Sequence, residues 1–256
     1  IIPLIFLIIF SKDKLGIFND LNKKFIFICL IRGLCFTGVN VFFFIAVINM
    51  EYAIAMTLTF ASPFFIALLS IVILKDKVGI YRWSAIIIGF AGVVMIMKPT
   101  SEIFKIYSIF PILVAFFWSL SMIVLKFVPE NISTAKIQFY SLFFSIVGAF
   151  ILYALTTGHQ PIESISHLIL MIMTGILGGT GGILFIYAYR LMLPSKLAPF
   201  EYLGIPSSFI LGWVFFKEAP IDQLFPGVVA IVLAGMIIIW RDAKRENVQK
   251  DSKKFY

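Results

Sequence analysis

Two charged residues interrupt a chain that is otherwise built from long apolar stretches. Of thirteen acidic residues only Glu201 lies inside such a stretch, and of 21 basic residues only Arg32 lies well inside one. A chain that is 61% hydrophobic and 13% charged has the composition of a polytopic membrane protein. Because a charge inside the bilayer costs free energy and usually serves a function, Glu201 and Arg32 are the first candidates for a site.

Eight stretches are long enough to cross a bilayer as helices, each of which needs roughly 20 apolar residues. The expected spans are Phe25–Met50, Tyr52–Leu74, Ile80–Met97, Tyr107–Val128, Ile137–Thr157, Leu168–Tyr189, Leu197–Phe216 and Gln223–Trp240. They are too long for membrane strands and do not alternate strictly, so we expect an all-α membrane helix bundle. Residues 1–10 are too short to cross, and we expect one or more further N-terminal helices to be missing from the chain.

Lysine and arginine set the expected orientation, because cytoplasmic loops are rich in both. With the loop before Phe25 placed inside, 17 of the 21 basic residues fall on that side and only three on the other. We therefore expect a multi-pass protein of the bacterial inner membrane whose residues 241–256 form a basic cytoplasmic tail. The net charge of +8 follows from this bias and requires no nucleic-acid partner.

Several short motifs recur in the same order at a shift of 142 or 143 residues, which indicates an internal repeat. The matches are Ala55-x7-Pro63 with Ala198-x7-Pro206, Thr37-Gly38 with Thr180-Gly181, Leu74-Lys75-Asp76 with Phe216-Lys217-Glu218, and Ala91-Gly92 with Ala234-Gly235. Lys75 and Lys217 fall on opposite sides of the membrane, so one repeat contains an odd number of helices, five on the expected spans. Inverted repeats of this kind are typical of transporters that alternate access around a site between the halves.

These motifs resemble the drug/metabolite transporter superfamily, specifically its EamA-like ten-helix members. The resemblance is carried by Ile31-Arg32-Gly33, Ala55-x7-Pro63, Leu74-Lys75-Asp76, Tyr81-Arg82-Trp83, Lys98-Pro99, Ala198-Pro199-Phe200-Glu201-Tyr202 and Phe215-Phe216-Lys217-Glu218-Ala219-Pro220. The first-half motifs are most similar to the S-adenosylmethionine uptake carriers of obligate intracellular bacteria. The resemblance implies two inverted five-helix repeats, at residues 1–98 and 107–240, and transport of small metabolites such as amino acids, nucleotide-derived compounds or vitamins.

Glu201 is the strongest candidate for direct contact with a substrate. A carboxylate in low dielectric holds a proton more readily than one in water, so it can carry a coupling proton or pair with a cationic substrate. The alternative is a structural carboxylate that accepts hydrogen bonds from neighbouring hydroxyls. Tyr202 beside it offers a ring face and a donor, which suits a zwitterionic or aromatic ligand, although helix packing explains it equally well.

Arg32 allows three interpretations. Its long stem can carry the charge to the cytoplasmic headgroups, it can pair with Glu201, or it can bind a carboxylate of the substrate. Pairing with Glu201 is plausible because both residues enter the membrane from the cytoplasmic side at similar depth.

Other polar residues of the spans are candidates for the lining of a cavity, with interhelical hydrogen bonding as the alternative for each. Those we select for the substrate site are Asn40, Thr59, Trp118 and Tyr187, and the wider set adds Thr37, Thr57, Ser62, Ser119, Ser121, Ser207 and Ser208. Pro63 and Pro206 lie inside equivalent spans, where each frees a backbone carbonyl and is expected to kink its helix towards the cavity.

The sequence contains no HExxH, CxxC or P-loop motif, so no metal or cofactor is expected. We expect a secondary transporter, not an enzyme, that moves a small polar or zwitterionic metabolite, either an amino acid or a nucleoside-derived compound such as S-adenosylmethionine. An intramembrane enzyme on lipid-linked substrates and a membrane scaffold without transport are the alternatives. Proton coupling and a homodimer stay open.

Overall fold

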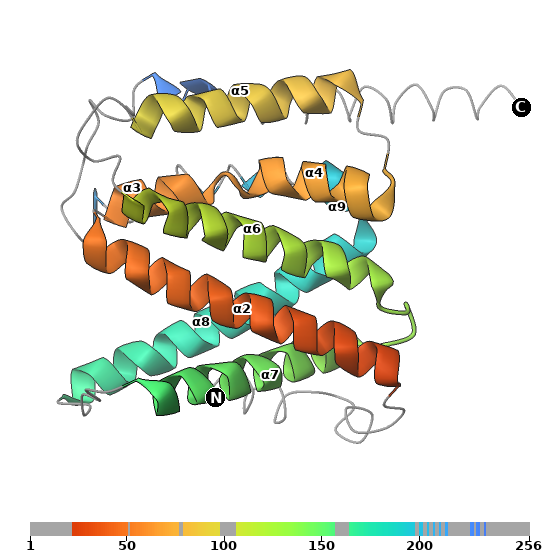
Figure 1. Ribbon diagram of the computed structural model, residues 1–256, viewed down its shortest axis with the longest axis vertical. Coiled ribbons are helices and arrows are strands. Elements are labelled where there is room, and N and C mark those ends of the chain that lie inside the picture. Colours follow the sequence, from red (N-terminus) through yellow and green to blue (C-terminus); the bar gives the residue numbers. More distant parts are fainter. Residues whose placement is uncertain are drawn as a thin grey trace, which may run out of the picture. The chain divides into compact units, whose positions relative to one another are not determined.

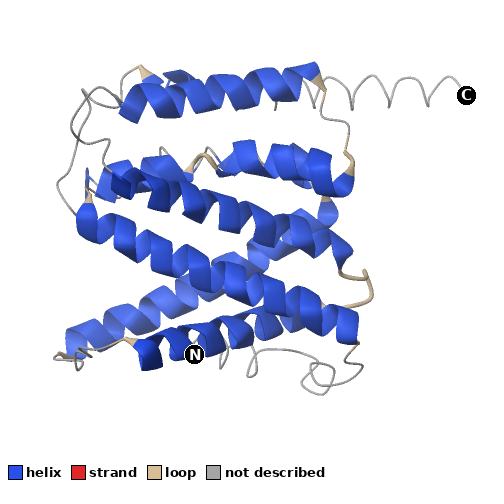
Figure 2. Ribbon diagram, in the orientation of Figure 1, coloured by secondary structure: helices blue, strands red, loops and turns tan. Residues whose placement is uncertain are grey.

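The structure is a computed structural model that describes residues 22–50, 52–76, 79–97, 106–156, 164–197 and 200–201, with a few further residues between 204 and 233. All regular structure in this described part is helical (Figure 2). The elements are α2 (Lys23–Asn49), α3 (Tyr52–Thr59), α4 (Ser62–Leu74), α5 (Ile80–Met97), η1 (Ile106–Ser108), α6 (Ile109–Val124), η2 (Leu125–Phe127), α7 (Thr134–Leu155), α8 (Ile165–Leu191) and α9 (Pro194–Leu197) (Figure 1).

Four stretches of the described chain are long and apolar enough to cross a membrane: α2, α6 together with η2, α7 and α8. Helix α4 is apolar but shorter. The prediction of a polytopic helix bundle is therefore confirmed. Most of the two last expected spans, Leu197–Phe216 and Gln223–Trp240, and all of residues 1–10 and 241–256 lie outside the described residues.

One expected span, Tyr52–Leu74, is not a single helix but two, α3 and α4, separated by a turn at Phe60 and Ala61. Proline explains the interruption, because Pro63 has no N–H to donate to the carbonyl four residues earlier. The Phe64 N–H then donates to Ala61 (3.1 Å) and the Ala61 N–H to Leu58 (3.1 Å), a tighter pattern than an α-helix. Pro63 therefore interrupts its helix as expected, and its position beside a cavity stays a prediction.

The chain packs into two compact units, and each is assembled from distant parts of the sequence. Unit 1 comprises Ile1–Val41 and Leu120–Leu193, and unit 2 comprises Phe42–Ser119 and Pro194–Tyr256. Each unit therefore includes residues of both predicted repeats, and α2 and α6 each contribute to both units. The division into inverted repeats at 1–98 and 107–240 stays a prediction from the sequence.

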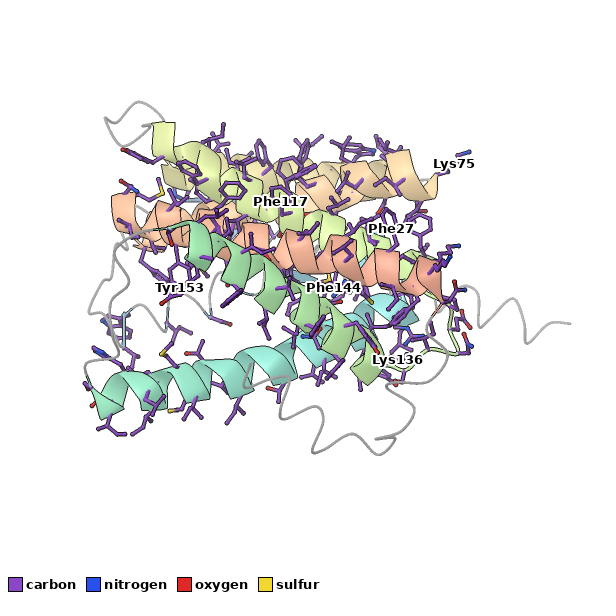
Figure 3. All side chains as sticks on the ribbon, turned by 60° about the horizontal axis from the view of Figure 1, so that its bottom comes forward. Phe27, Lys75, Phe117, Lys136, Phe144 and Tyr153 are labelled. Atoms are coloured by element: carbon purple, nitrogen blue, oxygen red, sulfur yellow. The ribbon has the colours of Figure 1, made fainter. Side chains whose placement is uncertain are left out.

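Unit 1 is held together by a close crossing of α2 and α7 through small residues. A Cβ placed on Gly33 would lie 2.9 Å from the Ser141 carbonyl oxygen and also collides with Phe144, which Figure 3 labels on α7. A Cβ on Gly148 would lie 2.6 Å from the Thr37 hydroxyl oxygen. That hydroxyl hydrogen-bonds to the Ser145 carbonyl at 3.2 Å. Small side chains thus let the two helix backbones meet, as is common between membrane helices.

Unit 2 is packed largely by aromatic side chains. Phe64 of α4 stacks on Phe90 of α5, with ring centroids 5.3 Å apart, and Phe65 meets Phe116 of α6 edge-on at 5.7 Å. Helix α4 also packs against α5 and α9. Contacts of this kind bury a large apolar area per side chain, which fixes α4 between its neighbours.

Candidate functional site

Glu201 forms the centre of a small hydrogen-bonded cluster in unit 2. The Ser62 hydroxyl donates to Glu201 Oε2 at 2.6 Å, and the indole N–H of Trp118 donates to Glu201 Oε1 at 3.0 Å. Ser62 begins α4 directly after the helix interruption, and Trp118 comes from α6. One carboxylate therefore ties the two helices to the segment that follows α9.

The donors that Ser62 and Trp118 present to Glu201 are neutral. Hydrogen bonds from a hydroxyl and an indole stabilise a carboxylate without cancelling its charge. Glu201 is half-buried, whereas Ser62 is 5% exposed. The carboxylate thus combines a fixed orientation with partial access, which suits the binding of a cationic group or a proton.

The backbone around the carboxylate is also closely packed. A Cβ on Gly204, one turn after Glu201, would lie 2.9 Å from the ring of Phe60, the residue at the helix interruption. The buried Ser119 hydroxyl lies 3.0 Å from the Ser62 carbonyl oxygen and 2.6 Å from the Ala115 carbonyl oxygen. The interruption between α3 and α4 is thus packed against Glu201 on one side and against α6 on the other.

Arg32 lies in unit 1 and is completely buried, so it does not reach the headgroups through its stem as one interpretation proposed. Its Nε donates to the Ser141 hydroxyl at 3.2 Å, and its Nη1 donates to the Ser121 carbonyl in the last turn of α6. Arg32 thus connects α2 to both α6 and α7. The pairing of Arg32 with Glu201 stays a prediction, because the two residues belong to different units.

Of the other selected residues, two bond to their own helices, one is exposed, and two lie outside the described part. The Asn40 amide donates to the Phe36 carbonyl at 2.7 Å and is exposed, and the Thr59 hydroxyl donates to the Met56 carbonyl at 2.6 Å. Tyr187 is 57% exposed on α8. Tyr202 and Pro206 lie outside the described residues. The structure therefore brings together Glu201 and Trp118 from the selected set, joined by Ser62 from the wider one.

Besides Lys136, two buried polar residues of α7 were not predicted as site residues, Gln138 and Ser141, which are 3% and 0% exposed. Both are polar residues near the start of the expected span Ile137–Thr157. Ser141, Ser145 and Gly148 follow the small-residue spacing that opposes Gly33 and Thr37, and this spacing is a sequence signal for Ser141. Gln138 carries no comparable signal in the sequence.

A model of the EamA-like transporter family matches residues 1–98 and 105–240, nearly the whole of the expected membrane region. The chain belongs to the EamA-like transporter family. This confirms the predicted superfamily and a multi-pass helical membrane protein. The predicted choice of a transporter over an enzyme agrees with membership of this family.

The names of curated relatives of the chain refer to different transported compounds. A riboflavin transporter of Rhizobium johnstonii is 30% identical over 207 residues, covering 79% of this chain and 66% of that protein. A riboflavin transporter of Vibrio cholerae is 27% identical over 194 residues, covering 76% and 64%. An S-adenosylmethionine uptake transporter of Rickettsia conorii is 27% identical over 240 residues, covering 92% and 79%. The chain thus spans slightly less than two thirds of the length of the two riboflavin transporters.

A solved crystal structure has the same fold, with a TM-score of 0.70 at 17% sequence identity. The superposition covers 92% of this chain and 82% of the other.

Proposed function

We propose that this chain acts as a secondary transporter that moves a small polar or zwitterionic metabolite across the bacterial inner membrane by alternating access. Family membership supports transport, and the names of the relatives supply the first compounds to test, riboflavin and S-adenosylmethionine. The excess of lysine and arginine on one side supports a cytoplasmic C-terminus. A homodimer is compatible with this proposal but is not required by it.

The observation that carries the proposal is the carboxylate of Glu201 beside an interrupted helix. Interrupted helices line the substrate or ion sites of many secondary transporters, because they bring backbone dipoles and polar side chains to membrane depth. Here Ser62, the first residue after the interruption, donates directly to Glu201. We assign to Glu201 the binding of a cationic group of the substrate or of a coupling proton.

The two donors of Glu201 suggest how binding is coupled to movement. A proton or an ammonium group that binds one carboxylate oxygen competes with Ser62 or Trp118 for that oxygen. Losing either hydrogen bond loosens α4 or α6 from the segment that follows α9. In this proposal, occupancy of Glu201 changes the connection between these helices, and that change accompanies the change of access.

Glu201→Gln tests this assignment with little structural damage. Trp118 can only donate a hydrogen bond, so the amide oxygen takes its place facing the indole, and the amide NH2 donates to the Ser62 hydroxyl. The variant therefore keeps the contacts with Ser62 and Trp118 and loses the charge and the titratable proton. Uptake of labelled riboflavin and S-adenosylmethionine into proteoliposomes is measured over a range of pH values.

We expect the variant to fold and to lose at least about tenfold in uptake, equivalent to about 1.4 kcal/mol. Ser119→Ala is the matched control, because this buried hydroxyl contacts Ser62 and Ala115 and not Glu201. Wild-type uptake and pH response in Glu201→Gln would show that the carboxylate has only a structural role. Absence of transport of any metabolite by the wild-type protein would instead favour the scaffold.

A further inference from the structure

Arg32 has hydrogen-bonding capacity left over in the interior of unit 1. Its side chain is 0% exposed, and its two hydrogen bonds go to a hydroxyl and a backbone carbonyl, which are both neutral. Within the described part of the chain, Nη2 has no hydrogen-bond partner. One face of the guanidinium lies over the Phe36 ring, 5.1 Å from its centroid, which favours the cation without neutralising it.

The buried charge of Arg32 would be stabilised by an anion. A guanidinium does not release its proton in proteins, so burial cannot be relieved by neutralisation. Lys136 of α7 is a second buried cation, 6% exposed and labelled in Figure 3, and Cys29 lies within electrostatic range of both. An anion that binds at the unpartnered Nη2 of Arg32 would compensate the buried charge of the guanidinium.

Gln138 provides a second polar atom without a partner on the same turn of α7. It precedes Ser141, the partner of Arg32, by three residues, a spacing that puts the two Cβ atoms about 5–6 Å apart. The Gln138 amide lies against α8, where a Cβ on Gly182 would be 2.5 Å from Nε2, and Oε1 has no partner among the described residues. Gly178 and Gly181 on α8 have open space where a Cβ would lie.

The donor and the acceptor are held in place by the surrounding helices. Ser141 and Ser121 orient the guanidinium from α7 and α6, and the close crossing at Gly33 prevents α2 from sliding along α7. Gln138 is confined between α7 and the glycine surface of α8. A ligand that accepts from Arg32 and donates to Gln138 therefore meets groups whose orientation is already set.

We propose that Arg32 and Gln138 form a site for an oxyanion that carries a hydroxyl or amine donor beside its charge. The anionic oxygen accepts from Arg32 Nη2, and the neighbouring donor binds Gln138 Oε1. The anion is either part of the transported substrate, in which case the inference rests on the proposed function, or a free anion.

Two acids that differ by one hydroxyl test the site directly. Lactate has a hydroxyl beside its carboxylate and propionate has none, so propionate reports on Arg32 alone and lactate on both residues. Binding of each to the purified full chain in nanodiscs is measured by calorimetry at constant ionic strength. We expect both acids to bind, with lactate about fivefold tighter, the contribution of one hydrogen bond.

Three variants assign the effect to residues. Gln138→Leu should abolish the preference for lactate and leave propionate unchanged. Arg32→Lys should weaken both acids about tenfold, because an ammonium lacks the planar fork of the guanidinium. Arg190→Lys is the matched control. Arg190 lies at the end of α8 and donates to the carbonyls of Pro129, Glu130 and Ile132 in the loop before α7. Its substitution should leave the affinities for both acids unchanged.

Failure of the wild-type protein to bind either acid would overturn the proposal, even if Arg32→Lys does not fold. Equal binding of lactate and propionate by the wild type would remove Gln138 from the site. If lactate inhibits uptake of riboflavin or S-adenosylmethionine, the site binds an anionic group of the substrate. If uptake is unchanged, the site binds a free anion. These binding results stand whether or not Glu201→Gln affects transport.

Discussion

Each unit contains one of the two charged residues singled out in the apolar stretches, Arg32 in unit 1 and Glu201 in unit 2, and their surroundings differ. In unit 1, Arg32 is fully buried between three helices and bonds to α6 and α7. In unit 2, Glu201 is half-buried and accepts hydrogen bonds from neutral side chains of α4 and α6. A buried cation that bridges helices is costly to remove, whereas a partly accessible carboxylate can exchange its partners. The comparison predicts a mainly architectural and anion-binding role for the first and a dynamic role for the second.

The largest effect should come from Arg32→Ala. The substitution removes a large buried side chain, leaves a cavity between α2, α6 and α7, and takes the donors from the Ser121 carbonyl and the Ser141 hydroxyl. We expect a loss of about 3 kcal/mol in the free energy of unfolding, measured by denaturation in detergent micelles. Glu201→Ala should lower the free energy of unfolding by less than half of this amount, because Glu201 is only half-buried. Equal losses would mean that the two residues are built into the protein in the same way.

Gly33→Ala should be the next most damaging change. The added methyl group lies 2.9 Å from the Ser141 carbonyl oxygen and from the Ser145 amide nitrogen, so α2 and α7 must separate. Overpacking of this kind costs about 1–3 kcal/mol in unfolding free energy. Gly178→Ala is the matched control, because open space surrounds that position and alanine favours the helix. If both variants were equally stable, the close crossing would not hold unit 1 together.

Trp118→Phe should have a moderate effect that is confined to unit 2. Phenylalanine keeps an aromatic ring and removes the N–H that donates to Glu201 Oε1, so the carboxylate loses this neutral donor. A hydrogen bond to a charged group contributes about 1.5 kcal/mol, and partial exposure puts this one at or below that value. Thermal unfolding measures the loss, and the uptake assay should show a shifted pH dependence in the same variant. An unchanged pH profile would separate Trp118 from the function of Glu201.

The smallest effect should follow Arg190→Lys, which compares an arginine at the edge of unit 1 with the buried Arg32. Arg190 donates to the Ile132 carbonyl at 2.6 Å and to the Glu130 carbonyl at 2.8 Å, which ties the loop before α7 to the end of α8. Lysine reaches only part of this set, and we expect a loss of about 1 kcal/mol. Hydrogen exchange should locate the change in residues 128–133. A loss as large as that of Arg32→Ala would show that exposure does not separate the two arginines.

The membrane class, the spans of α2, α6 with η2, α7 and α8 and the family all follow from the sequence, because apolar length and motif order are local properties. Glu201 and Trp118 were selected for scarcity of charge and for ring chemistry; the two are hydrogen-bonded to each other, and their role in substrate binding stays a prediction. Asn40 was selected by the same reasoning, yet its amide bonds within its own helix. The direction in which a helical side chain points depends on the neighbouring helices, which hydropathy does not specify.

Gln138 and Ser141 are buried polar residues that the sequence analysis did not select. A glutamine at the start of an apolar stretch is indistinguishable in sequence from one that faces the headgroups. Its burial depends on Gly182, a residue of another helix, whose missing side chain makes room for the amide. Pairings of this kind become visible only when α7 and α8 are placed side by side.

The way Glu201 reaches Ser62 and Trp118 has a consequence for synthesis. The ribosome completes α4 and α6 long before it adds Glu201, which follows Ser62 by 139 residues and Trp118 by 83. During that interval the Ser62 hydroxyl and the Trp118 indole N–H lack the Glu201 carboxylate, which accepts from them in the complete protein. In a nascent chain stalled before residue 201, α4 and α6 should therefore be packed less firmly against each other. Arrest of translation at successive positions would show at which chain length their packing becomes stable.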